Sequence, residues 1–214
     1  MLWSVIMKAS ALKAAVAELE SLPLGTTNDR FREMQSGKLI SKGEPGRYGG
    51  VTMTNSDRVN ALLACIFDPP RGQSRVAYVK RFRRFELSLA TYNPLRSKLS
   101  FEDNARAAFQ FIEGLGIMFE DLGHALDGIV GSMRTDAFAV WEAGVHANVA
   151  AEFHGDHTVS VMVDRPQANN YAIFKFEPAK ASAPTERAIE RIIRFNRIVF
   201  EKLAANDETA PDQG

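Results

Sequence analysis

Residues 24–50 read LGTTNDRFREMQSGKLISKGEPGRYGG and decide the fold of the N-terminal part of the chain. The hydroxyls of Thr26 and Thr27 suit the N-cap of a helix, because such an oxygen accepts a hydrogen bond from a backbone N–H of the first turn. Phe31 and Met34 then lie on one face of that helix. The stretch therefore predicts a helix from about residue 26 to about residue 36 with an apolar inner face.

A basic, glycine-rich hairpin is predicted after this helix. Gly37 ends the helix, residues 38–40 form a short strand, and residues 51–53 form the returning strand. The intervening residues 41–50 contain four glycines, one lysine and one arginine. We expect a projecting hairpin here, and a flexible loop with incidental charge is the alternative.

One amphipathic helix precedes this stretch and another follows it. Residues 8–22 carry apolar side chains at intervals of three and four and end at Pro23. Thr54 and Asp57 have the spacing of a capping box that opens a third helix, which Pro69-Pro70 ends. The apolar side chains expected on the inner faces are Leu12, Ala15, Val16, Leu19, Val59, Leu62, Leu63 and Ile66.

The order of helix, tight turn, helix, basic hairpin and helix is that of a winged helix-turn-helix. In that fold the second helix enters the major groove and the wing reaches the neighbouring backbone or minor groove. Side chains of the helix would specify bases, while lysines and arginines would position the phosphate backbone. The residues predicted to contact DNA are Thr26, Thr27, Asn28, Arg30, Arg32, Lys38, Lys42, Arg47 and Tyr48.

Residues 24–32, followed by Gly37-Lys38-Leu39-Ile40 and the Gly-Arg hairpin, resemble the MerR-type winged helix. The resemblance covers about 50 residues and implies DNA contact by the second helix and the wing, in a dimer. Glu33-Met34 stands where that family has an aromatic pair, and its long dimerising coiled coil does not follow the third helix. We therefore take from the resemblance the mode of DNA binding and no effector chemistry.

The formal charge is unevenly distributed along the chain. Residues 1–100 contain 16 Lys/Arg and 8 Asp/Glu, whereas residues 101–214 contain 10 and 18. A basic half is expected to meet a polyanion such as nucleic acid, where neutralised phosphates supply much of the affinity. The alternative is that the two halves attract each other.

A second basic cluster follows the predicted wing and contains Tyr78, Phe82 and Phe85. It either extends the phosphate-contacting surface or forms a solvated helix face, and its aromatic side chains fall at helical spacing, which favours a core position over base stacking. The cluster consists of Arg71, Arg75, Lys80, Arg81, Arg83 and Arg84.

The rest of the chain predicts helices and then an antiparallel meander. We expect a helix to about Arg84 and then a strand, a helical region from the Ser100 and Asp103 capping box to about residue 133, and alternating strands from residue 138. The tightest turn is predicted at residues 154–157, where Gly-Asp suits a two-residue hairpin.

The last predicted helix, residues 185–205, carries a possible dimer interface. Its apolar side chains keep alternating steps of three and four with an asparagine at one a position, a pattern that favours a paired register. Packing within the chain's own second domain is the competing interpretation. The predicted dimerisation residues are Ile189, Ile192, Asn196, Val199 and Leu203.

The expected fold class is α+β, with a winged helix-turn-helix at 1–70, a mixed helical and antiparallel dimerisation or regulatory domain at 71–206 and a disordered tail at 207–214. We expect a cytoplasmic homodimer that binds double-stranded DNA and represses transcription. No membrane segment, cofactor or catalytic motif is predicted. Alternatives are a protein-interaction module that docks an acidic partner and a small-molecule sensor.

Cysteine and histidine give little support to a metal site. The single cysteine, Cys65, lies in an apolar helical pattern and is expected to be a buried thiol. His154 and His157 flank the predicted hairpin turn and His146 precedes it, which is more typical of surface histidines than of a ligand set. We therefore predict neither a metal site nor an enzyme.

Overall fold

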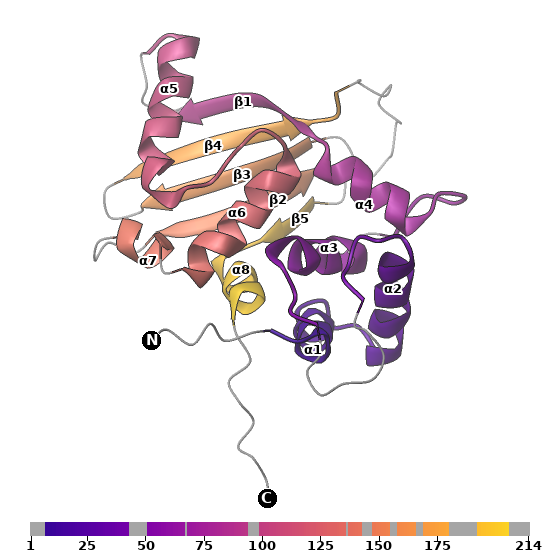
Figure 1. Cartoon of the computed structure of the whole chain (residues 1–214). Coiled ribbons are helices and arrows are strands. Elements are labelled where there is room, and N and C mark those ends of the chain that lie inside the picture. Colours follow the sequence, from indigo (N-terminus) through magenta and orange to yellow (C-terminus); the bar gives the residue numbers. More distant parts are fainter. Residues whose placement is uncertain are drawn as a thin grey trace, which may run out of the picture. The chain divides into compact units, whose positions relative to one another are not determined.

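The computed structural model combines helices with an antiparallel sheet, as predicted (Figure 1). The chain divides into two compact units: unit 1 is Met1–Lys80 with Lys202–Gly214, and unit 2 is Arg81–Glu201. The division falls ten residues beyond the predicted boundary, and the end of the chain returns to unit 1. The structure describes residues 7–42, 51–66, 68–93, 99–135, 137–142, 147–154, 158–165, 169–179 and 192–205.

Unit 1 is built on three helices: α1 (Ala9–Leu19), α2 (Leu24–Ser36) and α3 (Asn55–Ile66). They contact one another pairwise and enclose a common apolar core. Most of the predicted inner-face side chains are at most 5% exposed: Leu12, Val16, Phe31, Met34, Val59, Leu62, Leu63 and Ile66. Ala15 and Leu19, which were also predicted to face inward, are only half-buried.

The start of α2 differs from the prediction. The helix begins at Leu24, directly after Pro23, so Thr26 and Thr27 lie inside the first turns and do not cap them. The backbone N–H of Thr27 already donates to the carbonyl of Pro23 at 3.1 Å. Proline tolerates the position just before a helix because its missing N–H is not needed there.

The predicted strand at Lys38-Leu39-Ile40 is wrong. These residues form a turn and a bend, and among the described residues of this region the extended pairing is an isolated antiparallel bridge between Lys8 and Thr52. Residues 43–50, which include most of the predicted wing, lie outside the described part of the chain. The capping box of α3 is confirmed, because Thr54 and Asp57 exchange two hydrogen bonds at 2.9 and 3.1 Å.

Unit 2 begins within α4 (Arg75–Arg83) and contains a five-stranded antiparallel sheet in the order β1-β4-β3-β2-β5. The helix to about Arg84 and the strand after it are confirmed. The meander of β2, β3 and β4 is also confirmed, but its predicted start at residue 138 is wrong, because Ala137–Glu142 is a helix and β2 begins only at Asn148. The strands are β1 (Glu86–Tyr92), β2 (Asn148–His154), β3 (Thr158–Arg165), β4 (Asn170–Glu177) and β5 (Ile192–Phe195).

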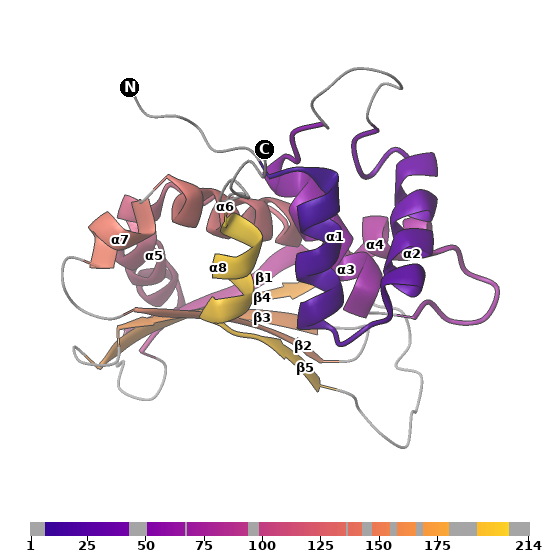
Figure 2. The same cartoon turned by 90° about the horizontal axis from the view of Figure 1, so that it is seen from below.

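One face of the sheet is covered by the helices of unit 2 (Figure 2). These are α5 (Phe101–Ile112), a short 3-10 turn η1 (Glu113–Leu115), α6 (Leu122–Arg134) and α7 (Ala137–Glu142). The predicted Ser100 cap of α5 is confirmed: its hydroxyl accepts from the Asp103 N–H at 3.2 Å. The buried sheet face has Val, Phe and Ala at every second position, including Val149, Phe153, Val161, Val163, Phe174 and Phe176.

The predicted helix at 185–205 is wrong over its middle part. Ile192–Phe195 is strand β5, which pairs with β2, and the helix that follows, α8 (Arg197–Ala204), has only eight residues. Pairing of the β-branched Ile192 and Ile193 with a sheet edge therefore overrides the helical period. A continuous dimer stripe through Ile192 and Asn196 is excluded.

The remaining members of the predicted dimer stripe are also placed differently. Leu203 is fully buried, Val199 is half-buried, and Ile189 lies outside the described residues. Asn196 does not occupy a helical a position, because it immediately precedes α8 and its side-chain oxygen accepts from the N–H of Val199 at 3.4 Å. Residues 192–195 thus form a strand and Asn196 precedes α8, where the predicted dimer stripe required one continuous helix.

Candidate nucleic-acid interface

The exposed face of α2 and the turn after it form the candidate interface. Helix α2 turns Thr27, Phe31 and Met34 into the core. Thr27 is fully buried and its hydroxyl donates to the Pro23 carbonyl at 3.4 Å, so it does not face a DNA groove. Its position four residues before Phe31 is a signal in the sequence that could have placed it inside. Thr26 is only half-buried.

Arg30 was predicted to read bases, and its contacts contradict that role. Its side chain is only 13% exposed, its Nη2 lies 2.9 Å from the Asp68 carboxylate, and its Nη1 donates to the Cys65 carbonyl. Arg75 joins the same network, 3.1 Å from Asp68 and 3.5 Å from Glu33. The guanidinium of Arg30 therefore ties α2 to the end of α3.

Arg32 lies on the outer side of α2, and Asn28, one turn before it, is half-buried. The side chain of Arg32 is 78% exposed, and its ion pair with Asp29 at 3.5 Å is equally exposed. Such a surface pair contributes about 0.2 to 1 kcal/mol, so it holds the guanidinium only weakly. Asn28, Arg32 and Ser36 follow one another at steps of four and therefore share one face of the helix.

The end of α2 places Lys38 in a backbone conformation that favours glycine. The Leu39 N–H donates to the Met34 carbonyl at 2.9 Å and the Lys38 N–H to the Gln35 carbonyl at 3.2 Å, which is the pattern of a Schellman motif. Lys38 occupies its left-handed position with φ of 59°. A residue with a side chain costs about 1 to 2 kcal/mol there, and glycine is usual.

Gly37 directly precedes the left-handed position but does not occupy it, because its φ is −79°. The glycine is explained instead by its packing. A Cβ on Gly37 would lie 2.5 Å from Cγ2 of Val76 at the start of α4. The glycine is therefore required by close packing, and the strained position after it is left to a lysine.

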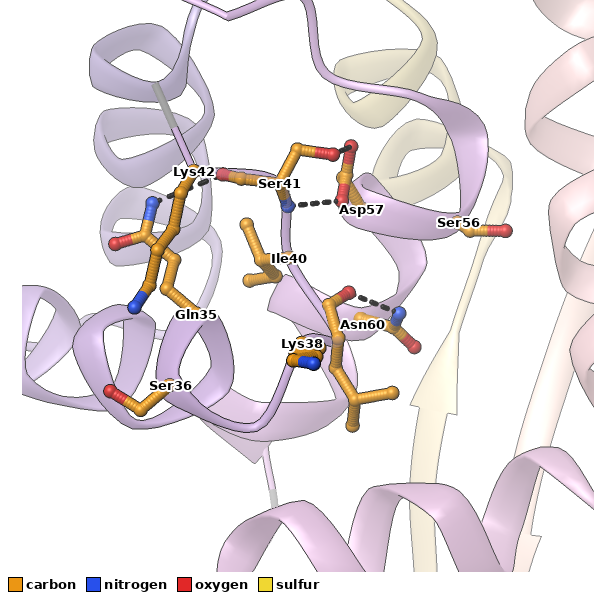
Figure 3. Close-up of a pocket in the computed structure, with 10 residues that line it drawn as sticks. Gln35, Ser36, Lys38, Ile40, Ser41, Lys42, Ser56, Asp57 and Asn60 are labelled. Carbon is orange, nitrogen blue, oxygen red and sulfur yellow. Dashed lines mark hydrogen bonds between the residues drawn. The ribbon is translucent and has the colours of Figure 1, made fainter. Parts of the chain in front are cut away.

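A surface hollow of about 490 Å³ lies between this turn and the start of α3 (Figure 3). Lys38 and Lys42 are exposed at the hollow, and Figure 3 shows Lys42 extending past Gln35 on the side of Ser36. Within the described ranges, neither ammonium lies in an ion pair with a carboxylate. The other lining residues are Gln35, Ser36, Leu39, Ile40, Ser41, Ser56, Asp57 and Asn60.

The backbone of the hollow is held by side chains from both helices. The Gln35 amide of α2 donates to the Ser41 carbonyl at 3.2 Å, and the Asn60 amide of α3 donates to the Leu39 carbonyl at 2.6 Å. These two amides fix the chain between Lys38 and Lys42. The charged side chains therefore project from a held backbone, and reasoning from the sequence did not find either amide.

Asp57 holds both ends of the segment between α2 and α3. Asp57 as a whole is 4% exposed, and its carboxylate accepts four hydrogen bonds, two from the N–H and hydroxyl of Ser41 and two from the N–H and hydroxyl of Thr54. The four distances lie between 2.8 and 3.0 Å. The predicted wing residues Arg47 and Tyr48 fall in the interval that Asp57 closes, and they lie outside the described residues.

Two arginines of the second basic cluster form ion pairs within the chain and are therefore not available to a partner. Arg75 lies in the network with Glu33 and Asp68, and Arg83 of unit 2 forms two hydrogen bonds to Asp127, at 2.6 and 2.9 Å. Its aromatic members Tyr78, Phe82 and Phe85 are buried, as their helical spacing indicated. The cluster members that remain exposed are Arg71, Lys80 and Arg84.

The charge asymmetry is weaker between the two units than between the two halves of the chain. Unit 1 contains 12 Lys/Arg and 10 Asp/Glu, and unit 2 contains 14 and 16. The reason is that five basic residues between 81 and 100 belong to unit 2. An electrostatic interface of unit 1 must therefore depend on where its cations lie and not on its net charge.

Cys65 is buried and free, as predicted. Burial raises the pKa of its thiol to about 11, and the neighbouring Arg30 and Arg75 only partly oppose this effect. The thiol therefore stays neutral at physiological pH and is not a reactive nucleophile. His154 lies at the end of β2, and His146 and His157 fall outside the described residues.

The described side chains contain no group of three or more His, Cys, Asp or Glu placed to hold a metal ion. Within the same ranges, every helix is too short or too polar to span a lipid bilayer. Comparison of the chain with models of protein families, with curated proteins and with solved structures finds no match. The function must therefore be argued from the geometry of unit 1.

Proposed function

We propose that unit 1 binds double-stranded DNA as a winged helix-turn-helix and that the chain regulates transcription. One observation carries the proposal: Lys38 is held in a strained left-handed conformation beside Lys42, and both ammoniums are free of carboxylate partners within the described residues. Strain at an exposed residue that glycine would relieve supports a role for the side chain itself.

The compact set of three helices fits this function. The turn between α1 and α2 is four residues long, which suits a helix-turn-helix. In the proposed complex, Asn28 and Arg32 on the outer face of α2 meet base edges, while Lys38 and Lys42 neutralise phosphates. Arg47 and Tyr48 lie outside the described residues, and for them the proposal keeps the expected contact with the neighbouring backbone or minor groove. Thr27 and Arg30 take no part, because both are engaged inside unit 1.

Removal of both hollow lysines tests the proposal. For the double variant Lys38→Ala and Lys42→Ala, we expect the slope of log K against log salt to become shallower by about 2, since each lost phosphate contact removes about 0.9. Affinity should be measured by fluorescence anisotropy on duplex fragments of the source genome at several salt concentrations. Lys202→Ala is the matched control, because that lysine is paired with Glu18 on another helix.

An unchanged salt slope in the double variant, with the control also unchanged, would remove Lys38 and Lys42 from the interface. If the native chain binds no duplex at any salt concentration, the proposed function fails. Capture of an acidic protein would then favour the alternative of a protein-interaction module.

Lys38→Gly is expected to separate stability from binding. Glycine relieves the left-handed strain, so the free energy of unfolding of unit 1 should rise by about 1 kcal/mol. DNA affinity should fall at the same time, because one phosphate contact is lost. Urea denaturation and anisotropy on the same preparation measure the two effects.

The matched control is Ser21→Gly. Ser21 has φ of 51° after α1, in the same kind of helix end, and it is not among the residues that line the hollow. This variant should gain stability without loss of affinity. A Lys38→Gly protein that binds DNA as well as the native chain would contradict a functional reason for the lysine.

A further inference from the structure

The hollow between the end of α2 and the start of α3 is larger than contact with a DNA phosphate requires. Its volume is about 490 Å³. Binding sites for small molecules have volumes of roughly 300 to 1,000 Å³. A backbone phosphate that touches Lys38 and Lys42 would leave most of this space unfilled. The hollow therefore has room for a separate small ligand.

The charge of the hollow indicates what kind of ligand it takes. Lys38 and Lys42 are both exposed there, and in the part of the chain that the structure describes neither ammonium has a carboxylate within ion-pair distance. A carboxylate ligand would bring one negative charge, whereas a phosphomonoester brings about 1.5 to 2 negative charges at pH 7. Two ammoniums therefore match a phosphomonoester best.

Asp57 is the lining residue whose charge opposes an anion. Figure 3 shows its carboxylate directed at Ser41, and it accepts four hydrogen bonds from Ser41 and Thr54 at 2.8 to 3.0 Å. These donors offset part of its negative charge. The repulsion between Asp57 and a phosphate held by the lysines is thereby reduced.

The rest of the hollow suits an apolar part of the ligand. Its accessible surface is mostly apolar, and the half-buried Leu39 contributes to it. The methylene stems of the two lysines add further apolar surface. The backbone is already fixed by the amides of Gln35 and Asn60, at 3.2 and 2.6 Å from the carbonyls they hold. A prepared site of this kind loses little entropy when the ligand binds.

We propose that the hollow binds a small phosphomonoester with an apolar body and that this ligand displaces DNA from Lys38 and Lys42. The displacement rests on the proposed function, because DNA and ligand need the same two ammoniums. Binding of the ligand itself does not depend on it. At a concentration about ten times its own dissociation constant, the ligand should raise the apparent dissociation constant for DNA about tenfold by mass action.

Calorimetric titration of the full chain without DNA tests the ligand class, with adenosine monophosphate as the probe. Cyclic adenosine monophosphate keeps the base and sugar but carries one negative charge, and inorganic phosphate keeps the charge without the apolar body. Both should bind about tenfold more weakly or worse. A cyclic compound that binds equally well refutes the match of two charges. Inorganic phosphate that binds equally well indicates an adventitious ion only, and no binding of any probe overturns the proposal.

Lysine variants test the location. Lys38→Ala and Lys42→Ala should each weaken binding of adenosine monophosphate about tenfold, because each removes one charged hydrogen bond. Lys80→Ala is the matched control, since Lys80 is an exposed lysine of unit 1 that does not line the hollow. Circular dichroism confirms that each variant is folded. If the two hollow variants bind as tightly as the control, the ligand does not occupy the hollow.

Competition at constant ionic strength separates this inference from the proposed function. Fluorescence anisotropy follows a bound duplex while adenosine monophosphate replaces an equivalent amount of salt. A duplex that binds but is not displaced by a saturating ligand overturns the competition and leaves DNA binding intact. A native chain that binds adenosine monophosphate in the calorimeter but binds no duplex refutes the proposed function, and with it the competition, while the ligand site stands.

Discussion

Arg58→Ala is expected to lower the free energy of unfolding of unit 1 by about 3 to 5 kcal/mol. Arg58 is fully buried in α3, and its Nη1 donates to the carbonyls of Leu203, Ala204 and Ala205 at 2.6 to 3.1 Å. Its Nε donates to the Met53 carbonyl at 3.3 Å. These carbonyls end α8, where a positive charge is favoured by the helix dipole. Alanine leaves them buried without a donor and opens a cavity.

Hydrogen exchange of the α3 amides measures this loss directly, because the chain has two units and a single denaturation midpoint would mix them. Arg58→Lys is expected to lose less, since the ammonium keeps the charge but not the planar fork of donors. The exposed Arg71→Ala serves as control and should change nothing. Equal protection in the Arg58→Ala and Arg71→Ala proteins would show that the contacts with residues 203–205 do not stabilise unit 1.

Asp57→Ala is the second large effect that we expect, a loss of about 2 to 3 kcal/mol. The variant removes the carboxylate half of the capping box of α3 and leaves the N–H groups of Ser41 and Thr54 without their acceptor, while the Thr54 hydroxyl still accepts from the N–H of residue 57. Both amides should exchange faster than the rest of unit 1. In Asp57→Asn, one of these two N–H groups faces an amide NH2 whichever way the side chain turns, so a loss of about 1 to 2 kcal/mol remains.

Asp103→Ala is the matched control for Asp57. Asp103 also lies three residues after a capping hydroxyl, that of Ser100, but its side chain is exposed and belongs to unit 2. We expect a smaller loss, confined to α5, and unchanged exchange at Ser41. If Asp57→Ala costs no more than Asp103→Ala, the four contacts of Asp57 do not hold the ends of the segment together.

The sequence predicted those features that depend on a few neighbouring residues. The caps at Thr54 and Ser100 and the meander of β2 to β4 rest on local spacing, and all are confirmed. The end of α2 at Gly37 was also predicted, but for the wrong reason. The glycine is needed against Val76, which lies 39 residues further along the chain, while Lys38 takes the conformation that glycine usually adopts.

The features that were missed depend on partners far away in the sequence. From the sequence alone, Arg30 is a cation on a helix with no evident partner. Only the fold places Asp68 beside it. Ile192 and Ile193 fit a helical period as well as a strand, and only the neighbouring β2 decides between them. Of the candidate interface, the sequence predicted Arg32, Lys38 and Lys42, which are exposed, and Asn28, which is half-buried. It predicted neither the hollow nor the amides of Gln35 and Asn60 that hold its backbone.

The contact of Arg58 with the end of α8 can form only after residues 203–205 have been synthesised. Its carbonyl partner Leu203 is added 145 residues later, which is roughly 7 to 30 s at ordinary ribosomal rates. Unit 2 is complete in the nascent chain before that point, whereas unit 1 still lacks residues 202–205. A product that terminates before Leu203 thus lacks the carbonyls that receive Arg58, and only a chain that extends past Ala205 completes the helical unit proposed to engage a promoter.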